Sequence, residues 1–165
     1  MCSGRVDLEF IFRAFANGMD GVFIGGCRLN ECNYITHGNY DALNIVLLSR
    51  KIMEHVGLNP ERLTVQFMSS GEGILFTEVV DQFSTKIRKL GPLGKAEKID
   101  EDQLKSKLAE VRKLIPYIKI AKRKKLESRL KSEKEYEGFS PKTKSTNYSA
   151  KSSHTILIRT NARPV

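Results

Sequence analysis

The stretch that decides the fold is Gly21-Val22-Phe23-Ile24-Gly25-Gly26-Cys27, a short apolar run that ends in a cysteine. A run of this kind, with no polar residue at alternate positions, is typical of a parallel strand that is covered on both faces. The preceding residues 7–17 predict a helix, because four apolar residues recur at helical spacing along one face. These residues are Leu8, Ile11, Phe12 and Phe15.

The pattern of helix and strand continues after this run. Residues 40–56 and 73–90 predict two further helices, and residues 63–68 predict a second strand. Alternation of this kind predicts an α/β fold, a parallel sheet with flanking helices, over residues 1–94. Two strands make a small sheet, so we interpret this domain as incomplete and expect a further strand-and-helix unit. Without that unit, the strand at 21–26 is expected to have an unpaired edge and exposed apolar faces.

The basic character of the chain lies in its C-terminal third. Residues 1–94 carry 9 basic and 10 acidic side chains, whereas residues 95–165 carry 19 basic and 9 acidic ones. Residues 95–137 are predicted to form a basic extension of charged α-helices, which Pro116 should kink or split. An apolar stripe along this extension suits docking onto a larger, acidic partner. The stripe comprises Leu104, Leu108, Val111, Leu114, Ile115 and Ile118.

The last segment differs in composition from the rest of the chain. Residues 138–165 contain no acidic residue and are rich in Ser, Thr, Lys and Asn, which predicts a disordered tail. No apolar stretch approaches the roughly 18–20 residues that span a bilayer, and the N-terminus has no signal-peptide pattern. These features predict a cytoplasmic protein without a membrane segment. In that reducing compartment, cysteines are more often metal-binding or redox-active than part of a disulfide framework.

The three cysteines of the chain lie in two loops. Cys2 opens Cys2-Ser3-Gly4-Arg5, and the other two lie in Gly25-Gly26-Cys27-Arg28-Leu29-Asn30-Glu31-Cys32. Each loop falls where a strand is expected to lead into a helix, so the sulfurs could converge at one edge of the sheet, near helix N-termini that favour a thiolate. The Cys-x4-Cys spacing is compatible with ligation of a 2Fe–2S cluster. Three thiolates are one fewer than the usual four ligands, so a further ligand would come from elsewhere.

Several other interpretations remain open at this point. The cysteines could be buried small hydrophobic residues. A thioredoxin-type dithiol normally has two residues between its cysteines, which this chain lacks. His37 could ligate a metal or pair with Cys32 in catalysis, although no orienting acid is evident. The basic C-terminal third could make the chain a nucleic-acid or acidic-partner binding module.

Five ordered runs give the chain a resemblance to a known family. It resembles the delta subunit of the methyl-viologen-reducing (non-deazaflavin-reducing) nickel–iron hydrogenase of methanogenic archaea, and the related electron-transfer subunits of heterodisulfide reductase. The resemblance covers about residues 1–95. The runs are Cys2-Ser3-Gly4-Arg5-Val6-Asp7, residues 20–27, Glu31-Cys32-Asn33-Tyr34, Gly38-Asn39-Tyr40 and Ser69-Ser70-Gly71-Glu72-Gly73.

This resemblance implies a function. The family's delta subunit is itself non-catalytic, holds a 2Fe–2S cluster and passes electrons from the hydrogenase to heterodisulfide reductase in methanogenesis. The matching motif positions imply Cys2, Cys27 and Cys32 as cluster ligands. Family members also have a preceding strand and loop with further cysteines, one of which is selenocysteine in some methanogens. We therefore hypothesise that Met1 is an internal methionine of a longer selenoprotein.

Overall fold

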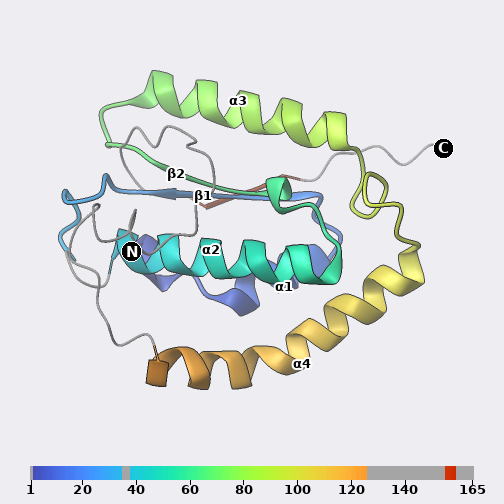
Figure 1. The fold of residues 1–165 in the computed structure, drawn as a ribbon. Coiled ribbons are helices and arrows are strands. Elements are labelled where there is room, and N and C mark those ends of the chain that lie inside the picture. The colour runs from blue at the N-terminus through green and yellow to red at the C-terminus, as the bar shows by residue number, and fades with distance from the viewer. Residues whose placement is uncertain (1, 35–37, 126–154, 159–165) are drawn as a thin grey trace.

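The structure of the protein is a computed structural model that describes residues 2–34 and 38–125 and the backbone of residues 155–158. The side chains of residues 122–125 and 155–158 lie outside this description. Figure 1 shows the arrangement of the elements. In chain order these are η1 (Ser3–Arg5), α1 (Leu8–Ala16), β1 (Gly21–Gly26), α2 (Asn39–Val56), η2 (Pro60–Arg62), β2 (Leu63–Phe67), α3 (Gly73–Leu90), α4 (Glu101–Lys125) and β3 (Thr155–Ile158).

Strand β1 lies at the centre of the sheet. It pairs with β2 in parallel, with Val22 opposite Leu63 and Gly26 opposite Phe67. All six residues of β1 are buried, whereas burial alternates along β2. The α/β prediction is therefore confirmed, and the apolar run at 21–26 is the doubly covered strand that its composition indicated.

Strand β3 corrects two expectations from the sequence. It pairs with the other edge of β1 in the antiparallel direction, which gives the strand order β2-β1-β3. The prediction of a disordered tail over residues 138–165 is thus wrong at Thr155–Ile158, and β1 has neither an unpaired edge nor exposed apolar faces. The physical reason is that a run rich in β-branched residues can supply hydrogen bonds to the free backbone edge of β1 from far away in the sequence. The rest of residues 138–165 lies outside the described residues.

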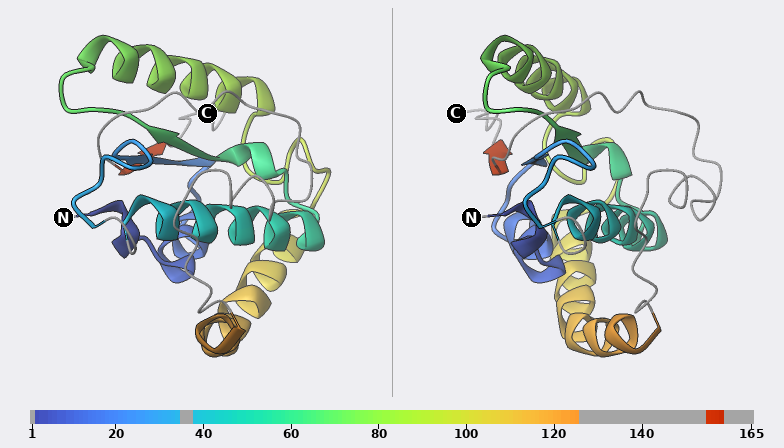
Figure 2. Two further views of the ribbon diagram at one scale, coloured as in Figure 1. Left: turned by 60° about the vertical axis from the view of Figure 1, so that its left-hand side comes forward. Right: turned by 90° about the vertical axis from the view of Figure 1, so that its left-hand side faces the viewer.

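Helices cover both faces of the sheet. Figures 1 and 2 show α3 on one face, α1 and α2 on the other, and α4 outside the α1–α2 layer. The main core fills the space between the sheet, α1 and α2, and a smaller one lies under α3. Helix α3 lies so close to β1 that a Cβ at Gly21 would be only 2.6 Å from Ile87 Cδ1. The smaller core consists of Phe23, Met68, Phe83 and Ile87.

Helix α4 packs on its own chain. Its apolar stripe belongs to the main core, so the expectation that this stripe serves to dock a partner is wrong for the buried residues. Two lysines add polar contacts, since Lys107 donates to the Val56 carbonyl at 2.9 Å and Lys119 pairs with Asp7 at 2.6 Å. Leu114 departs from the predicted stripe and is 55% exposed. The buried residues are Leu104, Leu108, Val111 and Ile115.

Pro116 bends α4 without splitting it. The helix runs without a break through this residue, and Figure 1 shows its axis changing direction along its length. Proline lacks the backbone N–H for one intrahelical bond, and its ring crowds the preceding turn. The predicted kink is therefore present, whereas residues 126–137 of the predicted helical extension lie outside the described residues.

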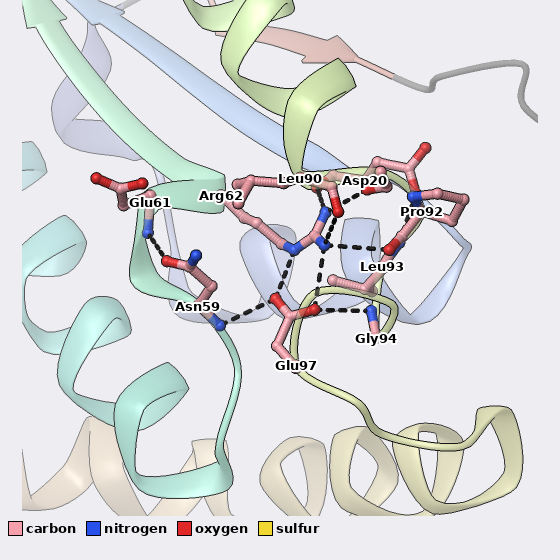
Figure 3. Close-up of polar contacts among 10 residues, drawn as sticks. Asp20, Asn59, Glu61, Arg62, Leu90, Pro92, Leu93, Gly94 and Glu97 are labelled. Atoms are coloured by element: carbon pink, nitrogen blue, oxygen red, sulfur yellow. Dashed lines mark hydrogen bonds and ion pairs between the residues drawn. The ribbon is translucent and has the colours of Figure 1, made fainter.

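A buried arginine holds the amino-terminal ends of the strands. Arg62 immediately precedes β2, is 0% exposed, and is the centre of the network in Figure 3. Its guanidinium donates to both carboxylate oxygens of Glu97, at 2.6 and 3.1 Å. The remaining hydrogen bonds of the guanidinium go to backbone carbonyls. Each of its three nitrogens therefore donates to at least one acceptor. These carbonyls belong to Asp20, Leu90, Gly91 and Pro92.

The carboxylate of Glu97 is also held by backbone donors. The N–H groups of Asn59 and Gly94 each donate to it at 3.1 Å. Asp20 completes the network by accepting the Leu93 N–H at 2.8 Å. The network therefore fixes the start of β1, the start of β2 and the chain that leaves α3 relative to one another.

We expect Arg62→Met to lower the free energy of unfolding by about 3–5 kcal/mol, because it leaves a buried carboxylate without its partner. Urea unfolding followed by circular dichroism measures the loss. The control is Lys51→Met, which removes the exposed Lys51–Glu54 pair and should change stability by less than about 1 kcal/mol. Equal effects of the two variants would show that the Arg62 network is not the constraint described above.

The same network predicts a pH dependence of stability. Burial opposes ionisation of Glu97, but hydrogen bonds from Arg62 and the Asn59 N–H outweigh it, so the pKa of Glu97 is lowered. A lowered pKa in the folded state adds stability that is present above the unfolded pKa of about 4.3 and is lost as the pH falls through the folded value. Urea unfolding of the wild-type chain from pH 6 downward should therefore show a decline below about pH 4–5 that is shallower in Glu97→Gln. Parallel curves for the two proteins would contradict this assignment.

Candidate functional site

The three cysteines lie at the carboxyl-terminal end of β1. Cys27 directly follows the strand, Cys32 ends the loop after it, and Cys2 caps the 3-10 turn η1. All three are free thiols. The structure brings two of them together, with Cys2 Sγ and Cys32 Sγ 3.7 Å apart. Cys27 lies near Cys32, close enough for its thiol to help lower the pKa of Cys32.

The cysteine loop is shaped by the first turn of α2. Asn39, which is fully buried, donates through Nδ2 to the Cys27 carbonyl at 2.9 Å and also to the carbonyl of Arg28. The Tyr40 hydroxyl donates to Asn30 Oδ1 at 2.7 Å, and Asn30 has a positive φ of 71°. These contacts fix where the loop turns and so place Cys27 and Cys32 relative to α2.

A second link joins the cysteine loop to the turn after β2. Arg28 Nη2 lies 2.9 Å from Glu72 Oε1, in an ion pair that is about two-thirds buried on each side. Glu72 immediately precedes α3, and the Met68 N–H donates to the Gly26 carbonyl at 2.7 Å. The loops that follow the two parallel strands therefore meet at one edge of the sheet, as parallel pairing requires.

Backbone N–H groups surround the sulfur pair. The Gly4 N–H donates to Cys2 Sγ at 3.5 Å, and the Tyr34 N–H donates to Cys32 Sγ at 3.4 Å. Burial raises the pKa of Cys2, and the neighbouring thiols add to this shift although the Gly4 N–H opposes it. Burial also opposes ionisation of Cys32, but the N–H groups of Tyr34 and Asn39 and the other two thiols outweigh it and lower its pKa. The two thiols therefore differ, with the pKa of Cys32 below and that of Cys2 above the ordinary value.

Gly38 leaves room for the sulfur pair. A Cβ at this position would clash with Cys32 Sγ and would lie 2.8 Å from the Tyr34 carbonyl oxygen and 3.2 Å from Cys2 Sγ, so a larger residue would displace the sulfurs and the backbone at Tyr34. Two buried polar atoms beside the cysteines, Ser3 Oγ and Asn39 Oδ1, have no hydrogen-bond partner among the described residues. A buried hydroxyl of this kind can donate to an additional acceptor, such as a sulfur atom held by the cysteines.

The donor set fits an iron–sulfur or zinc centre. Thiolates are soft ligands that select these metals. Two thiolates on one tetrahedral metal, with metal–sulfur bonds of about 2.3 Å, lie about 3.8 Å apart, which is close to the observed Cys2–Cys32 separation of 3.7 Å. Within residues 2–34 and 38–125, no three His, Cys, Asp or Glu side chains gather around a position for a single ion. The described arrangement is thus a close pair with a third thiol beside it.

Residue types alone do not identify three residues of the site. The roles of Ser3, Gly38 and Asn39 depend on contacts across the chain, although each lies in a run that carries the family resemblance. Arg5, which follows Cys2 by three residues, is exposed. His37 lies outside the described residues, so its assignment as a ligand or catalytic partner remains a prediction.

Comparison with known proteins identifies the family of the chain. The profile of the family described as methyl-viologen-reducing hydrogenase, delta subunit, matches residues 1–91. The chain belongs to this family. The resemblance stated from the sequence is therefore confirmed for the part of the chain that contains all three cysteines.

Curated relatives include two kinds of protein. The chain is 48% identical over 91 residues to an iron-sulfur subunit of the F420-non-reducing hydrogenase of Archaeoglobus profundus, which covers 55% of this chain and 66% of the relative. It is 39% identical over 94 residues to one subunit of the ferredoxin/F420H2-dependent CoB-CoM heterodisulfide reductase of Methanosarcina acetivorans, which covers 57% of this chain and 12% of that relative. The chain thus spans just under two thirds of the first relative and a small part of the second.

The location of the chain and the partner of its basic cluster are still predictions. No helix in the described part of the chain is long and apolar enough to cross a membrane, and the cytoplasmic location stays a prediction. The basic residues Lys122-Arg123-Lys124-Lys125 lie at the end of α4, but their side chains lie outside the described residues. Binding of nucleic acid or an acidic partner by these residues is therefore also an untested prediction.

We expect Gly38→Ala to separate Cys2 from Cys32 and to expose Cys32, which is 4% exposed. Alkylation of Cys32 by iodoacetamide, followed by mass spectrometry, should become several-fold faster than in the wild-type chain. Gly71→Ala is the matched control, because a Cβ at that position meets nothing within 4 Å. If Cys32 reacts at the wild-type rate in both variants, the space left by Gly38 does not determine the separation and burial of the sulfur pair.

Proposed function

We propose that the chain is the iron–sulfur electron-transfer component of a hydrogenase–heterodisulfide reductase complex, with a 2Fe–2S cluster bound by Cys2, Cys27 and Cys32. The observation that carries this proposal is the Cys2–Cys32 sulfur pair at 3.7 Å, with Cys27 beside it at the end of β1. Membership of the delta-subunit family and the similarity to a protein named for its iron-sulfur content support the same conclusion.

Each residue around the site has a defined role in this proposal. Cys2, Cys27 and Cys32 bind the cluster as thiolates, and a bound cluster supplies reversible one-electron transfer. The N–H groups of Gly4 and Tyr34 stabilise the negative charge on the Cys2 and Cys32 sulfurs. A fourth ligand is expected from outside the described residues.

The protein around the sulfurs controls access and charge. Cys32 is buried, and Asn39 holds the Cys27 carbonyl, so the loop excludes water from one side of the pair. Ser3 Oγ, which is buried without a partner among the described residues, can donate a hydrogen bond to the bound group. Hydrogen bonds to sulfur raise the reduction potential of such centres, so the protein sets the potential through these donors.

The partners follow from the two kinds of relative. One is named as part of a hydrogenase, and the other as part of a heterodisulfide reductase. We propose that this chain accepts electrons from a nickel–iron hydrogenase and delivers them to a heterodisulfide reductase. No bond of a substrate is made or broken on the chain itself.

We expect the chain, reconstituted anaerobically with iron and sulfide, to show the visible absorption of a 2Fe–2S cluster and an electron paramagnetic resonance signal after reduction. Cys27→Ser and Cys32→Ser should each lose most of the bound iron, because an oxygen ligand fits iron–sulfur ligation poorly. Ser70→Ala, in the exposed turn after β2, is the control and should bind iron as the wild type does.

Two results would contradict the proposal. Iron content and absorption that are unchanged in both cysteine variants would show that these cysteines are structural. A wild-type chain that takes up zinc but forms no coloured cluster would identify a structural metal site instead. If the cluster forms, a nickel–iron hydrogenase supplied with hydrogen should reduce it, which tests the electron-transfer part of the proposal separately.

A further inference from the structure

We propose that Cys2 and Cys32 form a thiol–disulfide exchange site for low-molecular-weight disulfides, which closes to an intramolecular Cys2–Cys32 disulfide when no metal is bound. The two sulfurs are 3.7 Å apart and already in hydrogen-bond contact. A disulfide bond is about 2.05 Å long, so the pair needs to approach by less than about 2 Å. Closure takes place in the metal-free chain and does not depend on the identity of the cluster.

The surroundings allow the approach. Each sulfur accepts a long backbone hydrogen bond, of 3.5 Å at Cys2 and 3.4 Å at Cys32, and neither contact locks a side chain in place. Cys2 lies in a short 3-10 turn, whereas Cys32 belongs to the loop that Asn39 and Tyr40 hold against α2. Closure therefore needs rotation at Cys2 and little movement of the loop.

Burial sets the order of the reaction. Cys32 is 4% exposed, whereas Cys2 is partly exposed, so an external disulfide reaches Cys2 first. The Cys2 thiolate attacks one sulfur of R–S–S–R, which forms a Cys2–S–S–R bond and releases one R–S⁻. The Cys32 thiolate then attacks the Cys2 sulfur, forms the Cys2–Cys32 disulfide, breaks the S–S bond of the mixed disulfide and releases the second R–S⁻.

The reaction is balanced without any further oxidant. The two protons lost by Cys2 and Cys32 are taken up by the two released thiolates. The protein therefore loses two electrons and two protons, and R–S–S–R gains them as two R–SH. A reducing thiol in excess reverses both steps.

Cys27 provides the internal comparison. Its backbone carbonyl is fixed by Asn39, and its sulfur is a neighbour of Cys32. Cys27 directly follows the buried strand β1, whereas Cys2 lies at a short 3-10 turn and can turn more easily toward Cys32, so we expect Cys27 to keep its thiol after oxidation. A Cys2–Cys32 bridge also ties the turn η1 to the loop after β1, and a crosslink of this kind stabilises the folded state.

The test uses the full chain, freed of metal with a chelator and treated anaerobically with oxidised glutathione. We expect an intact mass lower by two hydrogen atoms, no retained glutathione, and a Cys2–Cys32 crosslinked peptide after digestion without reductant. The midpoint of urea unfolding should rise, and dithiothreitol should restore the starting mass and midpoint. Cys27→Ser should behave in the same way, whereas Cys2→Ser should form no internal disulfide.

Two outcomes would overturn the inference. One is glutathione that stays bound to Cys2 without closure, and the other is a bridge that includes Cys27 in place of Cys2. Both can be read from the wild-type chain alone, so the test stands even if a variant fails to fold. Because the protein is metal-free throughout, the result is also independent of whether a cluster forms on reconstitution.

Discussion

The fold depends on one buried guanidinium. Arg62 connects segments that are distant in the sequence, because it binds Glu97 and the carbonyls of residues that precede β1 and follow α3. A buried charge is stable only when it is paired and its donors are satisfied. These segments therefore have to take their observed positions together, and the amino-terminal ends of β1 and β2 are fixed as a result.

The Arg62 network lies at the amino-terminal ends of the strands, so the cysteine site lies at the opposite end of the sheet. Arg62 and Asp20 precede β2 and β1, whereas Cys27 follows β1 and Glu72 lies in the turn after β2. Stability and the proposed function are thus separated along the strands. Such a separation suits a redox site, since loops at the carboxyl ends of parallel strands can be arranged around a ligand while the other end holds the fold.

Helix α4 shows how a charged segment can belong to a core. The family match ends at residue 91, yet the apolar side of α4 is buried in the same core as α1. Only a narrow stripe of α4 is buried, and the basic residues of its part up to residue 121 are exposed or half-buried. Lys107 and Lys119 contact Val56 and Asp7, so part of the positive charge serves to hold the helix in place. The exposed Leu114 and Tyr117 lie outside this contact.

The sequence alone determined the local elements. Apolar spacing located α1, β1, α2, β2 and α3 to within a residue or two. This is because the periodicity of a helix or strand depends on residues only a few positions apart in the sequence. The cysteines and their family were also identified from short runs such as Gly25-Gly26-Cys27. What only the tertiary structure decided depends on contacts between distant residues. The pairing of β3 with β1, the burial of α4 and the Arg62–Glu97 network could not be predicted, since no local pattern states which strand edge or which charge a residue will meet. The same holds for the site, where the 3.7 Å approach of Cys2 to Cys32 and the space left by Gly38 arise only when the loops are brought together at the end of β1.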